Sequence, residues 1–231
     1  AASPADDAGE NVEPEGFAYT GMDGTTFRES VEASKRTELD RLGSSKLLIA
    51  LTGARIERPR VLEVAAHSEH AARETFRAWA ADESHPEARA AFEAVAAQED
   101  EHLDRVLDAL DGDVDLADGG PMHAYLRGRE DTVERVASGM VGRPLVSIRA
   151  HNQLIGFFVN EADEVGANLF RDLKTETAAV IDDGVALLDE LCGDDADWER
   201  AEMVAEYVIQ VAYDDYADSL TEMGLGVKDI C

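Results

Sequence analysis

Two consecutive stretches decide the fold class: VLEVAAHSEHAARETFRAWA at residues 61–80 and EARAAFEAVAAQEDEHLDRVLDAL at residues 87–110. In both, apolar residues recur at i, i+3, i+4 and i+7, which is the period of one face of a helix. The polar turn between them ends in Ser84, and Pro86 follows closely, an order typical of a helix start. The pattern predicts two antiparallel helices, at about 59–81 and 84–112, joined by a short turn.

The same helical period continues on both sides of this hairpin. The other predicted helices cover residues 26–53 with a break near Gly43, 122–141 with an end near Gly142 and Pro144, 145–191 with a turn around 160–167, and 197–220. Thr26 and Asp197 are the expected starts of the first and last of them, and no stretch shows the alternating pattern of a β-strand. We therefore expect an all-α fold, with one helical domain at residues 25–231 after an extended or disordered acidic arm at 1–24.

Charge is the strongest feature of the composition. The chain has 50 acidic residues against 21 lysines and arginines, which gives a net charge of −29. This excess of acid is typical of halophilic proteins, because molar salt shortens the screening length to about 3 Å and weakens the repulsion between carboxylates. The composition predicts a halophilic protein and argues against nucleic acid as a partner.

The cysteines and the hydropathy of the sequence indicate the cellular location of the protein. Cys192 and Cys231 are far apart and form no Cys-x-x-Cys pair, which argues against a structural zinc site, an iron–sulfur cluster or a disulfide framework. No apolar run is long enough to span a bilayer, and the first residues are acidic rather than apolar. We expect a cytoplasmic protein that does not interact with membranes.

Glu99 and His102 form a Glu-x-x-His pair, which places both side chains on one face of the second helix of the hairpin. Such a pair also arises by chance in a chain with this many glutamates, so its position matters more than its presence. With residue 83 as the midpoint of the turn, Glu69 lies 14 residues before it and Glu99 lies 16 after it. At about 1.5 Å per residue, both carboxylates are about 21–24 Å from the turn and therefore face each other. Carboxylates buried among alanines are costly unless they are paired or bind a metal.

SEHAARETF at residues 68–76 and AQEDEHLDRV at residues 97–106 resemble the first half of the di-iron site in the rubrerythrin branch of the ferritin-like superfamily. The resemblance implies a four-helix bundle, here with additional N-terminal and C-terminal helices. It also implies that Glu69 is the carboxylate ligand of the first helix, Glu99 the bridging carboxylate and His102 the nitrogen ligand. Members of this branch bind iron or manganese and react with peroxide or oxygen.

A second half of such a site is expected later in the chain, and it is present in degenerate form. AHNQLIGFF at 150–158 and LKTETAAVIDD at 173–183 are similar to the two segments above. In this alignment Gln153 stands in place of the first carboxylate, Glu176 in place of the bridging carboxylate and Ala179 in place of the histidine. The loss of one carboxylate and one imidazole predicts weaker binding of a second ion, so that one ion, or none, is bound.

Four metal ligands are predicted, namely Glu69, Glu99, His102 and Glu176. A different alignment of the second half would bring Glu161 or Glu164 to the position of Gln153. The leading hypothesis is a non-haem iron or manganese protein that acts in peroxide or oxygen chemistry or in metal handling.

The hypothesis has two rivals. The first is a ferritin-like scaffold that has lost catalysis and acts as a protein-interaction module. The second is a helical fold of the haem-oxygenase type with one axial histidine.

Because the sequence has no second iron site built from two Cys-x-x-Cys pairs, any electron donor is expected to be a separate protein. A homodimer is the expected assembly.

Overall fold

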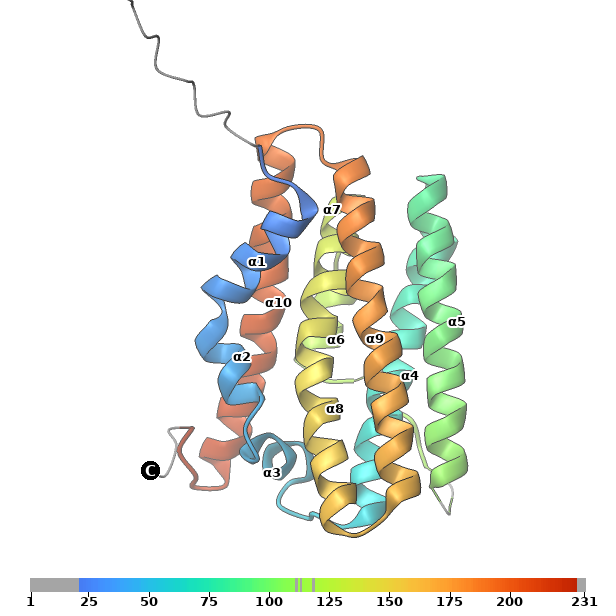
Figure 1. Cartoon of the computed structure of the whole chain (residues 1–231), viewed down its shortest axis with the longest axis vertical. Helices are drawn as coiled ribbons and strands as arrows, with labels where there is room; N and C mark the ends of the chain where they lie inside the picture. Colours follow the sequence, from blue (N-terminus) through green and yellow to red (C-terminus); the bar gives the residue numbers. More distant parts are fainter. Residues whose placement is uncertain (1–20, 111, 113, 118, 228–231) are drawn as a thin grey trace, which may run out of the picture.

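Every regular element in the described part of the chain is a helix in the computed structural model (Figure 1). The described residues are 21–110, 112, 114–117 and 119–227. The all-α class is confirmed for these residues. The predicted acidic arm at 1–24 lies almost entirely outside them, and the first helix already begins at Gly24.

The predicted hairpin is formed by α4 (Arg58–Asp82) and α5 (Pro86–Ala109), which pack along their whole length. The prediction that Ser84 caps the second helix is wrong, because the cap is His85, whose ring accepts a backbone N–H group of the first turn. The reason is Glu83, whose carboxylate accepts the backbone N–H groups of both Ser84 and His85. These two hydrogen bonds hold both residues in the turn, so the helix begins only after His85.

A second hairpin is formed by α8 (Arg143–Asn160) and α9 (Glu164–Leu191), and α9 packs against α5. The predicted turn between them is confirmed, and Asp163 caps α9 by accepting a backbone N–H group of its first turn. Close packing at this end requires a glycine, because a Cβ atom at Gly166 would lie 2.4 Å from the ring of Phe158.

The segment predicted as one helix at 122–141 is instead interrupted. It contains α6 (Pro121–Arg127), α7 (Thr132–Arg135) and a π-helical turn, η1 (Val136–Gly142), that continues directly into α8. Pro144 therefore does not end a helix, contrary to the sequence pattern. It is the second residue of α8, directly after the π-helical turn, and the change from π to α geometry at this point accommodates a residue without an N–H group.

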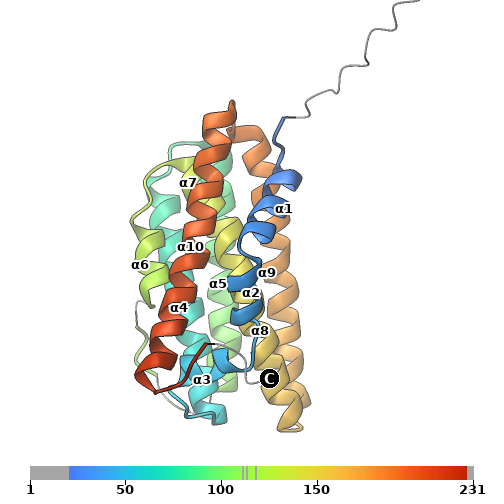
Figure 2. The same cartoon turned by 90° about the vertical axis from the view of Figure 1, so that its left-hand side faces the viewer.

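The last long helix, α10 (Asp195–Glu222), packs against η1 and α8. From residue 21, where the described part of the chain begins, three short helices precede the first hairpin: α1 (Gly24–Ser34), α2 (Arg36–Leu42) and α3 (Lys46–Thr52). Each of them contacts α10, and Figure 2 shows α1 and α2 lying beside it. The predicted break near Gly43 is confirmed, since this residue ends α2.

Two helices start earlier than predicted, and for the same reason. Asp23 caps α1 by accepting the N–H group of Thr26 at 2.7 Å, and Asp194 caps α10 by accepting the N–H group of Asp197 at 3.1 Å. The short side chain of an aspartate reaches the N–H group three residues ahead. Thr26 and Asp197 therefore lie in the first turn of their helices and donate a backbone N–H group to the capping residue.

The apolar core is divided into two clusters along the hairpins. On α4, Ala66 belongs to one cluster and Phe76 to the other, and on α5 Ala96 and Leu103 are divided in the same way. The level between the clusters is occupied by buried polar side chains, which form the candidate site described below. Within the described residues, no helix combines the length and the apolarity needed to cross a membrane.

Candidate metal centre

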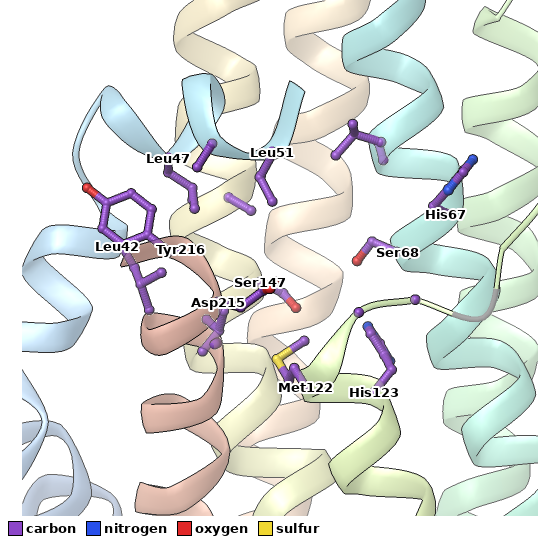
Figure 3. Close-up of a pocket in the computed structure, with 18 of the residues that line it drawn as sticks. Leu42, Leu47, Leu51, His67, Ser68, Met122, His123, Ser147, Asp215 and Tyr216 are labelled. Atoms are coloured by element: carbon purple, nitrogen blue, oxygen red, sulfur yellow. The ribbon is translucent and has the colours of Figure 1, made fainter. Parts of the chain in front are cut away.

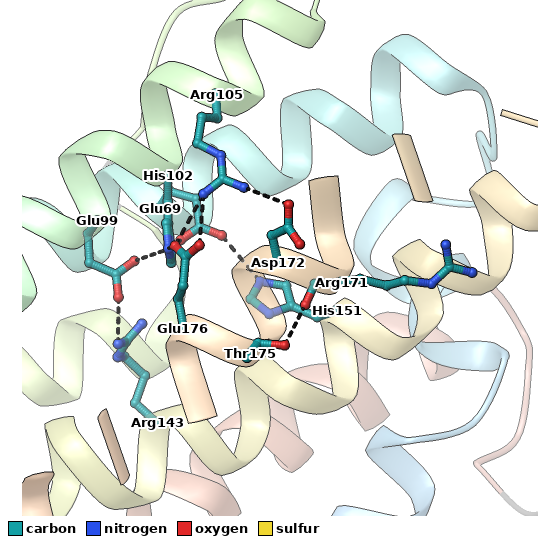
Figure 4. A network of polar contacts seen from close by, with 10 residues as sticks. All are labelled: Glu69, Glu99, His102, Arg105, Arg143, His151, Arg171, Asp172, Thr175 and Glu176. Carbon is teal, nitrogen blue, oxygen red and sulfur yellow. Dashed lines mark hydrogen bonds and ion pairs between the residues drawn. The ribbon is translucent and has the colours of Figure 1, made fainter. Parts of the chain in front are cut away.

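The hairpin of α4 and α5 brings two carboxylates and one imidazole together inside the protein (Figure 4). Glu69 of α4 is 4% exposed, and Glu99 and His102 of α5 are 1% and 0% exposed. One potential ligand atom from each residue lies within 4.8 Å of those of the other two. These are the three residues that the level of the turn and the Glu-x-x-His spacing predict, and together they could hold a metal ion.

The distances within this group fit one ion better than direct hydrogen bonds. His102 Nδ1 lies 3.8 Å from Glu69 Oε2 and 3.9 Å from Glu99 Oε2, beyond hydrogen-bonding range. His102 Nδ1 and Glu99 Oε2 are buried and have no hydrogen-bond partner within the described chain. Two ligand atoms bound at about 2.0–2.2 Å to the same ion are up to about 4.4 Å apart, so the observed spacing leaves room for one ion between them.

Glu176 of α9, the fourth predicted ligand, lies on the other side of the imidazole. Its Oε2 is 2.7 Å from His102 Nε2, and Arg105 Nη1 donates to both of its oxygens at 3.1 and 3.2 Å. Although burial raises the pKa of Glu176, the contacts with His102 and Arg105 outweigh burial and lower it. An ionised carboxylate only accepts, so Nε2 of His102 carries a proton, and Nδ1 is the nitrogen that faces Glu69 and Glu99 and could bind an ion.

The sequence did not predict Arg143, the residue that neutralises Glu99. Its Nη2 donates to Glu99 Oε1 at 2.7 Å, its Nε donates to the carbonyl oxygen of Gly139 at 3.3 Å, and its side chain is 2% exposed. An arginine within the apolar segment VASGMVGRPLV is the signal that could have identified it, because a buried charge needs a partner. One guanidinium cannot balance two carboxylates, so Glu69 and Glu99 still need a proton or a metal ion.

The pKa values in the group follow from this imbalance. Burial, together with the neighbouring Glu69, raises the pKa of Glu99 to about 7, although Arg143 acts in the opposite direction. Burial would also raise the pKa of Glu69, but contacts with His102 and His151 outweigh it and hold the pKa well below its usual value. Burial lowers the pKa of His102, and the carboxylates around it outweigh burial and raise it. The group therefore attracts a cation.

The second hairpin contributes a different residue from the one the alignment indicated. His151 Nε2 lies 3.4 Å from Glu69 Oε1, and the imidazole is buried. Gln153, aligned with the first carboxylate, instead donates from its amide to the carbonyl oxygen of Gly43 at 2.6 Å. Two residues along a helix separate these positions by roughly 200°, so only one of them can face the site.

The remaining candidates of the second half do not reach the group. Glu161 and Glu164 are exposed at the turn between α8 and α9, and Ala179 is exposed on α9. Neither glutamate therefore replaces Gln153 in this structure. From the second hairpin, His151 contacts Glu69 directly, and Glu176 contacts His102.

His123 of α6 is buried near the group, and its Nδ1 has no hydrogen-bond partner among the described residues. Burial lowers its pKa to about 3, and the positive charges of Arg143 and Arg127 act in the same direction. It is therefore neutral in the folded protein at neutral pH.

A pH dependence of stability follows from His123. In the unfolded chain its pKa is about 6.5, so its stabilising contribution is complete above that pH and is lost as the pH falls towards 3. We expect about 2 kcal/mol of stability to be lost from this residue between pH 7 and pH 5. Denaturant unfolding at both pH values, in molar salt, should show a smaller loss for His123→Gln than for the unmodified chain. Equal losses would contradict the assignment.

Comparisons of the chain with protein-family models, with curated proteins and with solved structures give no match. The function of the chain is therefore inferred from the site. Its donor atoms are two carboxylate oxygens and one imidazole nitrogen, without sulfur, a combination that suits manganese, iron or zinc rather than the softer ions that prefer thiolates.

Proposed function

We propose that this chain is a ferritin-like, rubrerythrin-like metalloprotein that binds one iron or manganese ion through Glu69, Glu99 and His102. The ion would serve redox chemistry with peroxide or oxygen, or the handling of the metal itself. The observation that carries the proposal is a pair of buried ligand atoms, Glu99 Oε2 and His102 Nδ1, which lie 3.9 Å apart and have no hydrogen-bond partner among the described residues. Leaving such atoms unpaired costs about 1–3 kcal/mol each, which a bound ion would recover.

The ferritin-like relationship is supported by the resemblance of residues 68–76 and 97–106 and by the arrangement of the helices. Two hairpins, α4 with α5 and α8 with α9, pack together, and the buried carboxylates lie inside them. Sites in bundles of this kind are built from side chains on facing helices.

Arg143 is the reason for proposing one ion rather than two. Its guanidinium holds the second oxygen of Glu99 at 2.7 Å, so this carboxylate cannot bridge two metals. The ion would supply one-electron redox chemistry. The chain would then orient His102 through Glu176, balance Glu99 through Arg143 and keep water away with the apolar clusters on either side.

Elemental analysis tests the proposal. Protein produced with iron and manganese in the medium should contain about one ion per chain, and Glu99→Ala and His102→Ala should contain almost none. Glu101→Ala is the matched control, since Glu101 is an exposed glutamate on the same helix. The iron-loaded protein should also consume hydrogen peroxide faster than the metal-free protein. Metal-free unmodified protein would contradict the proposal.

A second candidate function is favoured by the ion pair of Arg143 with Glu99, which neutralises one carboxylate without a metal. In that case a protonated His102, whose pKa is raised because burial is outweighed by the surrounding carboxylates, would balance Glu69, and the bundle would act as a scaffold for a protein partner. This candidate predicts that purified protein lacks metal and that Glu99→Ala leaves its partner binding unchanged.

Glu176 should influence metal affinity without being a ligand. Glu176→Gln removes the charge that keeps the proton of His102 on Nε2, so the imidazole no longer presents Nδ1 reliably. We expect the dissociation constant for Mn²⁺ to rise by about 10–100-fold, with stoichiometry unchanged. Titration calorimetry against Mn²⁺ measures both quantities, and an affinity equal to that of the unmodified chain would show that Glu176 has no positioning role.

A further inference from the structure

A cavity of about 360 Å³ lies beside the candidate metal centre, among α3, α4, α6, α8 and α10 (Figure 3). Most of its wall is apolar and includes Leu47, Leu51 and Leu154. Glu69 and His151 line the cavity and also belong to the polar group described above. Its volume lies within the range of about 300–1,000 Å³ that is usual for small-molecule sites.

Three imidazoles in this wall have a ring nitrogen without a hydrogen-bond partner in the described part of the chain: the partly exposed His67, at Nε2, and two that are buried. The unpaired atoms of the two buried imidazoles are Nδ1 of His123 and Nδ1 of His151, and each residue is 4% exposed. Figure 3 shows Met122 and His123 of α6 on one side of the cavity and Leu47 and Leu51 of α3 on the other. Because an unpaired buried polar atom costs about 1–3 kcal/mol, a ligand that supplies the missing hydrogen bond gains affinity at this point.

The charges on the wall indicate an uncharged ligand. Glu69 is the buried carboxylate, and Asp215 adds a second, exposed carboxylate, so an anion would be repelled. Arg60 also lines the cavity, but its guanidinium is paired with Glu63 at 2.9 Å. His123 is neutral at neutral pH, because burial lowers its pKa, and therefore cannot attract an anion.

We propose that this cavity binds a small, uncharged, mainly apolar organic molecule that carries one hydroxyl or similar group. The group lies at His123 and His151, and the apolar part lies among the leucines of α3 and α8. The role of the molecule as a substrate held beside the ion rests on the proposed function. Its binding does not, because neither His123 nor His151 is one of the proposed metal ligands.

Fluorescence titration with 2-naphthol tests the binding, with naphthalene and 2-naphthoate as matched probes. We expect saturable binding of one 2-naphthol per chain, weaker binding of naphthalene, and binding of the 2-naphthoate anion at least about 10-fold weaker than that of 2-naphthol. No saturable binding of 2-naphthol, or equally tight binding of the anion, would overturn the inference.

Variants locate the bound probe. Ala150→Leu fills part of the cavity and should weaken 2-naphthol and naphthalene alike by about 10-fold or more, while Asn152→Leu, an exposed position on the same helix, should change neither. His123→Leu should weaken 2-naphthol by about 3–10-fold and leave naphthalene unchanged, because it removes only a hydrogen bond. Unaltered 2-naphthol binding in both cavity variants would place the probe elsewhere and overturn the inference.

Titrating metal-loaded and chelator-treated protein separates this inference from the proposed function. Binding of 2-naphthol by protein that takes up no metal would overturn the proposed function and support the site. Metal uptake without 2-naphthol binding would overturn the inference and leave the proposed function intact.

Discussion

Arg143→Met should lower the free energy of unfolding of the metal-free protein by about 3–5 kcal/mol, the usual cost of removing one partner from a buried ion pair. Arg143 and Glu99 are 2% and 1% exposed, so solvent cannot replace the lost contact at 2.7 Å. Glu99 would have to take up a proton or remain charged inside the core. Denaturant unfolding of chelator-treated protein in molar salt measures the effect.

Two comparisons make this prediction specific. Arg105→Met removes a guanidinium that is more accessible and pairs with the half-exposed Glu176, so we expect a loss below about 1 kcal/mol. Adding Glu99→Gln to Arg143→Met removes the unbalanced charge and should restore most of the lost stability. Similar losses for both arginines, or no recovery in the double variant, would show that the buried charge pair does not control stability here.

Metal binding should stabilise the fold by a similar amount. When free Mn²⁺ exceeds its dissociation constant by about 1,000-fold, the free energy of unfolding should rise by about 4 kcal/mol, reduced by any weak binding to the acidic unfolded chain. Glu99→Ala should abolish the increase, because it removes one of the two carboxylates that lie beside Nδ1 of His102. Thermal or denaturant unfolding with and without Mn²⁺ measures it.

Glu101→Ala again serves as the control, because it removes one carboxylate from the exposed face of the same helix. It should retain the full stabilisation. Stabilisation that persists in Glu99→Ala and falls in Glu101→Ala would mean that Mn²⁺ binds the acidic surface instead.

The first half of the site could be predicted because it depends on local periodicity alone. Once residues 61–80 and 87–110 are read as helices with a turn near residue 83, the levels of Glu69 and Glu99 follow from the rise per residue. His102 follows from the spacing of neighbours on one helical face. The structure places all three as this reasoning predicts.

The second half could not be predicted, because it depends on how distant segments pack. His151 and Gln153 are equally plausible neighbours of Glu69 until the rotation of α8 about its axis is known, and the structure turns Gln153 towards Gly43. Arg143 was missed for a related reason: Pro144 indicated a helix end, whereas η1 continues into α8 and carries the arginine into the core.

The most direct test of the account is an anomalous difference map from a crystal of the protein loaded with Mn²⁺, recorded on the high-energy side of the manganese absorption edge. The account predicts one peak per chain, bonded to Nδ1 of His102 and to carboxylate oxygens of Glu69 and Glu99, with Arg143 still paired to Glu99. A crystal that shows no peak between these three side chains, or shows manganese bound only at surface carboxylates, would contradict the account.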